Sequence, residues 1–151
     1  MAKDNSVKLM NMTRELKICT DLNQSRRLSK KLPWTSADAY YINGDPDKLT
    51  LGRWTTDEHD DDDVPAWSLS ALYLILPVGT TILKQHCPGN EFTNSAYSAE
   101  CVTDGGYKMS TALYYDPLNA LCELVARLKP FELEFDPALY GKIKKTNNKE
   151  L

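Results

Sequence analysis

Turn-forming residues divide this chain into short segments, and their positions constrain the fold more than any other feature. An Asn-Gly-Asp-Pro-Asp cluster separates two runs that contain aromatic and β-branched residues, 38–42 and 48–54. An Asp-Gly-Gly cluster separates a second pair of runs, 97–103 and 107–113. Asp-Gly supplies the positive φ angles that tight hairpin turns require. The pattern therefore predicts two β-hairpins.

Capping residues and prolines predict three helices. Asp21 has Gln24 three positions further on, which is the pattern of a capping box, and this helix is expected to extend to about Leu32. The second helix begins at Ser68, and the third begins at Asp116 with a proline in its first position. Each has apolar residues at helical spacing. The prolines expected to end these helices are Pro33, Pro77 and Pro130.

Three further segments have strand-like sequences. Residues 16–19 are expected to be either a loose lead-in or a short strand, 80–85 is predicted as a strand, and 131–135 alternates apolar and acidic residues as an edge strand does. Helices and strands mix without the regular alternation of a doubly wound sheet. We therefore predict an α+β fold, with an antiparallel sheet of two hairpins and about three helices packed on one side.

Length and composition indicate a single domain. The chain has 151 residues, of which 42% are hydrophobic, and this is enough to form a core without a metal or a disulfide. Residues 1–15 are predicted to be a flexible lead-in, 16–140 the single α+β domain and 141–151 a polar tail.

Several features favour a cytoplasmic location. The longest apolar run, 71–78, is far shorter than the roughly 20 residues of a membrane-spanning helix. The N-terminus lacks the apolar segment of a signal peptide. The four cysteines are widely spaced, and Cys101 and Cys122 fall within predicted elements, as is typical of buried free thiols in a reducing compartment.

Charge is unevenly distributed along the chain. Residues 1–35 hold eight Lys/Arg against three Asp/Glu, a local charge of +5, whereas residues 36–63 hold two against nine, a local charge of −7. The two regions could bind partners of opposite sign, or one could neutralise the other in the fold.

The predicted helix 22–32 and the acidic segment supply the candidate interaction surface. The helix could contact phosphates, and an aromatic side chain after it could stack on bases. The chain as a whole is acidic, however, and this favours a solvated helix face paired with the acidic segment over nucleic-acid binding. The candidate residues are Arg26, Arg27, Lys30, Lys31, Trp34, Asp60, Asp61 and Asp62.

Residues 57–63 form an acidic run that also contains His59. Carboxylates bind hard cations, and His59 could add a nitrogen ligand. A calcium loop, however, places its carboxylates at alternating positions with a glycine at the turn, and this run has neither feature. The sequence therefore favours a solvated acidic loop, and we predict no metal site and no cofactor.

Catalytic motifs are absent from the sequence, which contains no nucleophile elbow, phosphate-binding loop or zinc-binding helix. His86 and Cys87 are adjacent, but neighbouring side chains of an extended segment point to opposite faces and do not form a nucleophile–base pair. Carboxylates such as Asp38, Asp116 and Glu123 are available, although the sequence alone does not show that they converge. No catalytic residue is therefore assigned.

Four segments form a set of motifs: 19–28, 36–41, 64–72 with Leu76-Pro77, and 116–120. Together they resemble a group of small proteins encoded by gut bacteria and by their prophages or mobile elements. The resemblance covers roughly residues 16–130, and Ala39 stands where the group often has Met. It implies a shared fold and a phage or mobile-element setting, and it implies no activity.

These observations lead to one expected function and two alternatives. We expect a small non-enzymatic protein-interaction or accessory protein of a phage or mobile element, with a protein partner. The first alternative is a small-ligand binder or enzyme with an unmarked site. The second is a nucleic-acid binder that uses the basic helix 22–32. The sequence does not specify the oligomeric state.

Overall fold

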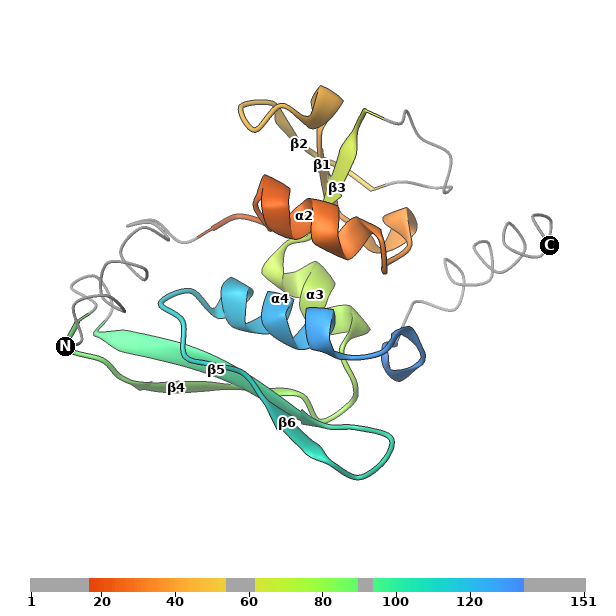
Figure 1. Cartoon of the computed structure of the whole chain (residues 1–151). Coiled ribbons are helices and arrows are strands. Elements are labelled where there is room, and N and C mark those ends of the chain that lie inside the picture. Colours follow the sequence, from red (N-terminus) through yellow and green to blue (C-terminus); the bar gives the residue numbers. More distant parts are fainter. Residues whose placement is uncertain (1–16, 54–61, 90–93, 135–151) are drawn as a thin grey trace.

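The computed structural model describes residues 17–53, 62–89 and 94–134 of the chain. Within these ranges it contains two three-stranded antiparallel sheets, and the helices α2, α3 and α4 lie between them (Figure 1). The predicted α+β class is confirmed. The predicted lead-in and polar tail lie outside the described residues, as do residues 57–61 of the acidic run, which include His59, Asp60 and Asp61.

The first sheet contains the first predicted hairpin. Strands β1 (Ala39–Tyr41) and β2 (Leu49–Leu51) pair with Ala39 opposite Leu51, and β3 (Val64–Ala66) pairs with the other edge of β1. The turn between β1 and β2 contains the short 3-10 helix η2 (Ile42–Gly44), in which Asn43 and Gly44 both have positive φ angles. These conformations explain the Asn-Gly pair at the turn.

The second sheet contains the second predicted hairpin. Strands β5 (Ser95–Val102) and β6 (Lys108–Ser110) pair with Cys101 opposite Met109. Strand β4 (Thr81–His86) pairs with the other edge of β5 and follows α3 in the chain. Ala99 and Cys101 point inward, where α4 packs on β5.

The three predicted helix starts are confirmed. Asp21 and Gln24 form a capping box at α2 (Leu22–Ser29), Ser68 accepts a hydrogen bond from Ala71 N at α3 (Leu69–Ile75), and Asp116 accepts one from Leu118 N at α4 (Pro117–Arg127). Helix α2 ends three residues earlier than predicted, and the 3-10 helix η1 (Trp34–Ser36) follows Pro33.

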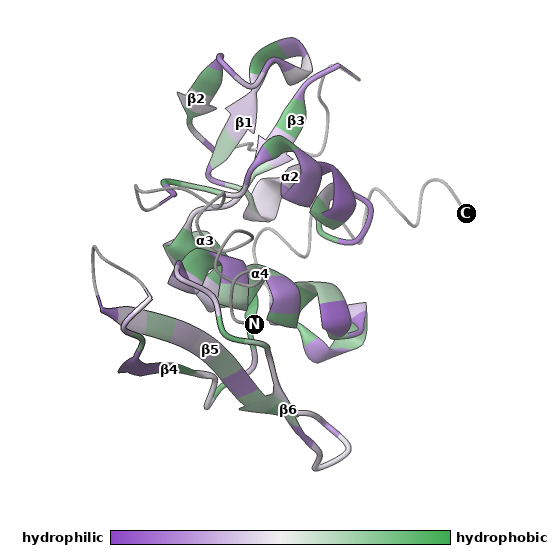
Figure 2. Ribbon diagram, turned by 60° about the vertical axis from the view of Figure 1, so that its left-hand side comes forward, coloured by the Kyte–Doolittle hydropathy of each residue, from purple (hydrophilic) through white to green (hydrophobic). Residues whose placement is uncertain are grey.

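The main core lies between the helices and the second sheet. Leu118, Leu121 and Leu124 of α4 are fully or almost fully buried there, together with Trp67 just before α3. A smaller cluster of Cys19, Tyr41 and other side chains lies beneath the first sheet. Figure 2 shows that α3 is mostly hydrophobic along its length, whereas α2 is mostly hydrophilic.

Two segments with strand-like sequences do not form strands among the described residues. The segment around residues 16–19 contributes only a single bridge between Cys19 and Ser68 in its described part. The segment predicted as an edge strand begins with the 3-10 helix η3 (Pro130–Glu132), in which Leu133 N donates to the oxygen of Pro130. Pro130 fixes φ in the helical range and lacks an N–H for a strand ladder, so the local turn overrides the alternating sequence pattern.

Candidate functional site

Helix α3 is apolar on both faces, and only one of them is covered. Ala71, Leu72 and Ile75 are buried in the core. On the other side Tyr73 is 49% exposed and Leu74 is 66% exposed. A surface helix normally carries polar residues on its outer face. The exposed face of α3 is therefore the first candidate for a functional surface.

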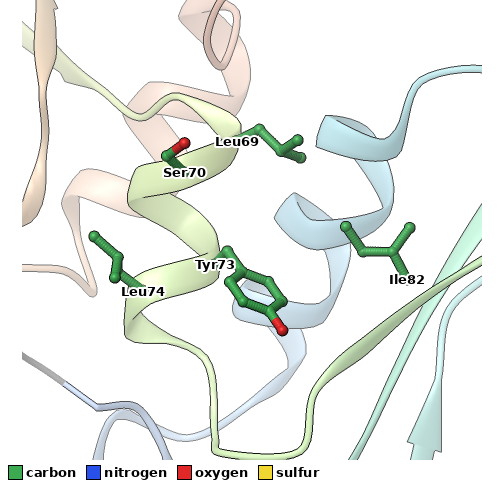
Figure 3. A pocket seen from close by; sticks show the side chains of 5 residues that line it. All are labelled: Leu69, Ser70, Tyr73, Leu74 and Ile82. Atoms are coloured by element: carbon green, nitrogen blue, oxygen red, sulfur yellow. The ribbon is translucent and has the colours of Figure 1, made fainter.

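A groove of about 540 Å³ lies along this face, between α3 and the start of β4. We call it the α3–β4 groove. Figure 3 shows that Leu69, Ser70, Tyr73 and Leu74 come from α3 and that Ile82 comes from β4 across from the helix. The Tyr73 hydroxyl donates to Thr80 O at 3.1 Å, so this polar group is already engaged. The surface that the groove presents to a ligand is consequently mainly apolar.

The basic residues of the candidate interaction surface do not form one open face. Lys31 Nζ donates to the carbonyls of Val125 and Ala126, at 2.9 and 2.8 Å, and so binds the end of α4. Burial lowers the pKa of Lys31. Burial also raises the pKa of the Cys122 thiol to about 11, and Arg27, which lies beside that thiol, opposes the rise. Two of the four positive charges thus face α4.

The other described residues of that surface come from α2, the residue after it, η1 and the segment before β3. Arg26 is exposed on α2, Lys30 is exposed directly after it, Trp34 is half-buried in η1, and Asp62 is exposed just before β3. Both Arg26 and Asp62 lie against the turn at Gly44. A Cβ atom added to Gly44 would be 3.1 Å from Arg26 Nη2 and 3.4 Å from the backbone oxygen of Asp62. The fold therefore brings the basic helix close to the end of the acidic segment.

The three candidate carboxylates each bind different partners. Asp38 accepts hydrogen bonds from the backbone N–H and the hydroxyl of Ser68. Asp116 accepts from Leu118 N and also from Lys17 N, the latter at 2.7 Å. Glu123 accepts from the Tyr114 hydroxyl and from Arg127. They hold helix ends and side chains in place and do not share a common site.

His86 and Cys87 lie at the end of β4. His86 is exposed and Cys87 is half-buried. The pKa of Tyr115 is raised by burial and, to a smaller extent, by Cys87, whose thiol is hydrogen-bonded to the Tyr115 hydroxyl. Among the described residues, no three His, Cys, Asp or Glu side chains come together in a way that could hold a metal ion.

The Tyr114–Glu123 hydrogen bond predicts an alkaline titration. Burial, followed by the hydrogen bond and charge of Glu123, raises the pKa of Tyr114 to about 12. This hydroxyl therefore stabilises the fold fully below the ordinary tyrosine pKa of about 10, and the contribution disappears as the pH rises through 12. In an alkaline titration of the natural protein, the absorbance of the Tyr114 phenolate should appear near pH 12. The Tyr114→Phe variant should lack this step. If the Tyr114 hydroxyl of the folded protein titrated with a midpoint near pH 10, this would contradict its burial and its hydrogen bond to Glu123.

Comparison with protein families, with curated proteins and with solved structures finds no match for this chain. The resemblance to small proteins of gut bacteria and their prophages therefore stays a prediction. Within the described ranges, none of the helices combines the length and the apolar character that crossing a bilayer requires.

The sequence did not indicate the α3–β4 groove. Leu69, Leu72 and Tyr73 recur at helical spacing, which predicts one apolar face, yet Tyr73 is half-exposed and lines the groove. The available signal was the run Leu-Tyr-Leu-Ile-Leu at 72–76, which is apolar all round the helix. Such a helix is either fully buried or left with an uncovered face, and its sequence does not distinguish the two.

Proposed function

We propose that this chain is a non-enzymatic protein-interaction protein and that the α3–β4 groove binds an amphipathic helix of its partner. The observation that carries this proposal is the exposed apolar face of α3, where Tyr73 and Leu74 stand beside the groove. Exposed apolar patches that line a groove are characteristic of protein–protein contact sites.

The chemistry of the groove favours a helical apolar partner over a small polar ligand. Binding sites for small molecules and substrates combine an apolar lining with several converging polar groups. Here the polar lining residues are Ser70 and Tyr73, and the Tyr73 hydroxyl is bonded to Thr80. Binding energy would therefore come from burial of apolar side chains presented at helical spacing.

Charge adds one further expectation about the partner. Helix α3 has no charged residue, and the nearest charge along β4 on the face of Ile82 is Lys84. Lys84 is exposed, with its ammonium 6.0 Å from the ring centre of Tyr97. We propose that the partner helix has an acidic residue beside its apolar stripe, which would pair with Lys84. The phage or mobile-element setting rests on the resemblance described above.

The nucleic-acid alternative has less support. It requires the positive charges of α2 to face one phosphate backbone, whereas Lys31 binds carbonyls of α4 and Arg27 lies beside Cys122. Arg26, Arg27 and Lys30 are exposed. Three surface charges, one of them beside Cys122, give a weak electrostatic footprint on a chain whose net charge is −3.

A helical peptide tests the proposed function. The probe is an Ala-based peptide of about 15 residues with Leu at i, i+3 and i+7 and Glu at one end; its control has the same composition without the stripe. We expect the striped peptide to shift the backbone amide resonances of Leu69, Tyr73, Leu74 and Ile82. Shifts located elsewhere, or equal shifts with the control peptide, would reject the groove as the binding site.

A matched pair of variants strengthens this test. Leu74→Lys places a charge at the groove, whereas Val102→Lys places one at the end of β5, and the two native side chains are 66% and 59% exposed. Burying a leucine contributes about 1.5–3 kcal/mol. Leu74→Lys should therefore weaken peptide binding by about tenfold or more, and Val102→Lys should leave it unchanged. Equal losses in both variants would count against the proposal.

A further inference from the structure

Opposite charges lie at opposite ends of helix α3. Glu134 is exposed at the C-terminal end, where its backbone N donates to Ile75 O at 2.7 Å. Strand β4 follows the helix after a short turn and runs back beside it, so that Ile82 lines the α3–β4 groove (Figure 3). Lys84 stands about 6.6 Å further along the strand, on the same face as Ile82. It therefore lies beyond Ile82 in the direction of the N-terminal end of α3.

The exposed face of α3 carries a small residue and a large one at matching positions. Ser70 and Leu74 lie one turn apart on this face, and both are exposed. If two α3 helices are placed antiparallel about a twofold axis at the level of Leu72, Leu74 of each copy stands opposite Ser70 of the other. Large side chains that face small ones interdigitate. Because α3 has no charged residue, no like charges of the two helices meet. The exposed face of α3 is therefore complementary to itself.

We propose that the α3–β4 groove binds helix α3 of a second copy of this chain, in an antiparallel and twofold-symmetric pair. This arrangement brings the C-terminal end of each α3 to the N-terminal end of the other, so that Glu134 of one copy meets Lys84 of the other copy. Among the described residues, Lys84 forms no ion pair within its own chain. The inference rests on the proposed function, because it names the helix that occupies the same groove and assigns Glu134 as the partner's acidic residue.

The charges select the orientation of the pair, and the apolar side chains supply most of its stability. In a parallel pair, Lys84 would lie beside Lys84 and Glu134 beside Glu134, and like charges disfavour that alignment. Exposed ion pairs add little on their own, so most of the affinity comes from burial of Tyr73 and Leu74. Helix α3 has seven residues, and a contact this small is typical of transient complexes. We therefore expect a reversible dimer with a dissociation constant of the order of tens of micromolar.

Sedimentation velocity of the full chain tests this inference through two charge reversals. The natural chain should change from mostly monomer to mostly dimer between about 5 and 500 µM. Lys84→Glu and Glu134→Lys each place two like-charged pairs in the dimer, so each variant alone should associate about tenfold more weakly. Mixed in equal amounts, the two variants should associate as tightly as the natural chain, because their heterodimer has an opposite-charge pair at both contacts.

Control variants separate this contact from general effects of charge. Lys48→Glu changes the net charge as Lys84→Glu does, but Lys48 is exposed in the turn between β1 and β2, so this variant should associate like the natural chain. Leu74→Lys should abolish association, whereas Val102→Lys should leave it unchanged.

Three results would overturn the inference: a natural chain that stays monomeric up to about 500 µM, charge reversals that do not weaken association, or mixed variants that do not restore it. If a charge variant loses its native fold in circular dichroism, the natural chain alone is used. The amide resonances of Ser70 and Leu74 should then shift with protein concentration, and resonances that stay in place overturn the inference as well.

Failure of this inference is distinguishable from failure of the proposed function. Because the striped peptide and a second copy would occupy the same groove, the peptide should reduce self-association. If the chain stays monomeric and the peptide shifts the groove resonances, the second copy is not the partner, and the proposed function stands with a helix of another protein. If the mixed charge variants associate but the peptide causes no shift at the groove, the second copy is the partner and the binding of other helices is rejected.

Discussion

Replacing Trp67 with alanine is expected to lower the free energy of unfolding by about 3–5 kcal/mol, the cost typical of removing a large buried aromatic side chain. Trp67 is fully buried in the main core. Its indole Nε1 donates to Ser36 Oγ at 2.9 Å, and its backbone N and O bond Thr20 at 3.1 and 2.9 Å. The residue therefore joins the segments before and after α2 to the start of α3.

Urea unfolding followed by far-ultraviolet circular dichroism measures this loss. Trp67→Phe keeps most of the apolar volume and should cost less than Trp67→Ala, with the remaining loss due to the Ser36 hydroxyl left without its donor. Tyr107→Ala is the surface control, because Tyr107 is 75% exposed and its loss should change stability by about 0.5 kcal/mol or less. Similar losses for Trp67→Ala and Tyr107→Ala would contradict the burial of Trp67.

Lys17→Met is expected to have the second largest effect, a loss of about 1.5–3 kcal/mol. The Lys17 ammonium binds Asp21 Oδ2 at 3.0 Å and Asn119 Oδ1 at 2.9 Å, which joins the first turns of α2 and α4. The Lys17 side chain is only 14% exposed. Methionine fills a similar volume but removes the ammonium donor: Asp21 Oδ2 loses its bond, and Asn119 Oδ1 keeps only the bond from Gln24 Nε2. Most of the expected loss therefore comes from these broken polar contacts.

An exposed ion pair provides the matched control for Lys17. Lys108 and Glu100 approach to 3.1 Å, nearly the same distance as Lys17 and Asp21, but the Lys108 side chain is 66% exposed. Exposed pairs contribute about 0–1 kcal/mol, so Lys108→Met should cost much less in the same urea titration. The prediction for Lys17 would be refuted by equal losses in the two variants.

Local signals explain why much of the fold could be predicted. Asp21, Ser68 and Asp116 cap their helices as expected, because a cap satisfies backbone N–H groups within three residues of itself. The two hairpins were predictable for the same reason, since positive φ angles at the turns favour Gly and Asn. The candidate site was less accessible, because the exposure of Tyr73 and Leu74 depends on which distant elements cover α3.

The segment after α4 shows how two local signals can compete. Residues 131–135 alternate like a strand, but Pro130 and the hydrogen bond from Glu132 N to Lys129 O form a 3-10 turn instead. A strand needs a neighbour with free backbone groups, and in the described structure Glu134 N bonds Ile75 O at the end of a helix. The alternation in the sequence contained no information about that neighbour.

The sequence by itself determined the helix starts, the hairpin turns and the α+β class, because each depends on backbone conformations and hydrogen bonds between nearby residues. Only the tertiary structure decided that the helices lie between two sheets, that Lys31 binds the end of α4, and that one apolar face of α3 stays open. These features depend on packing between residues far apart in the chain. A leucine has the same sequence signal whether a neighbouring element covers it or leaves it beside a groove.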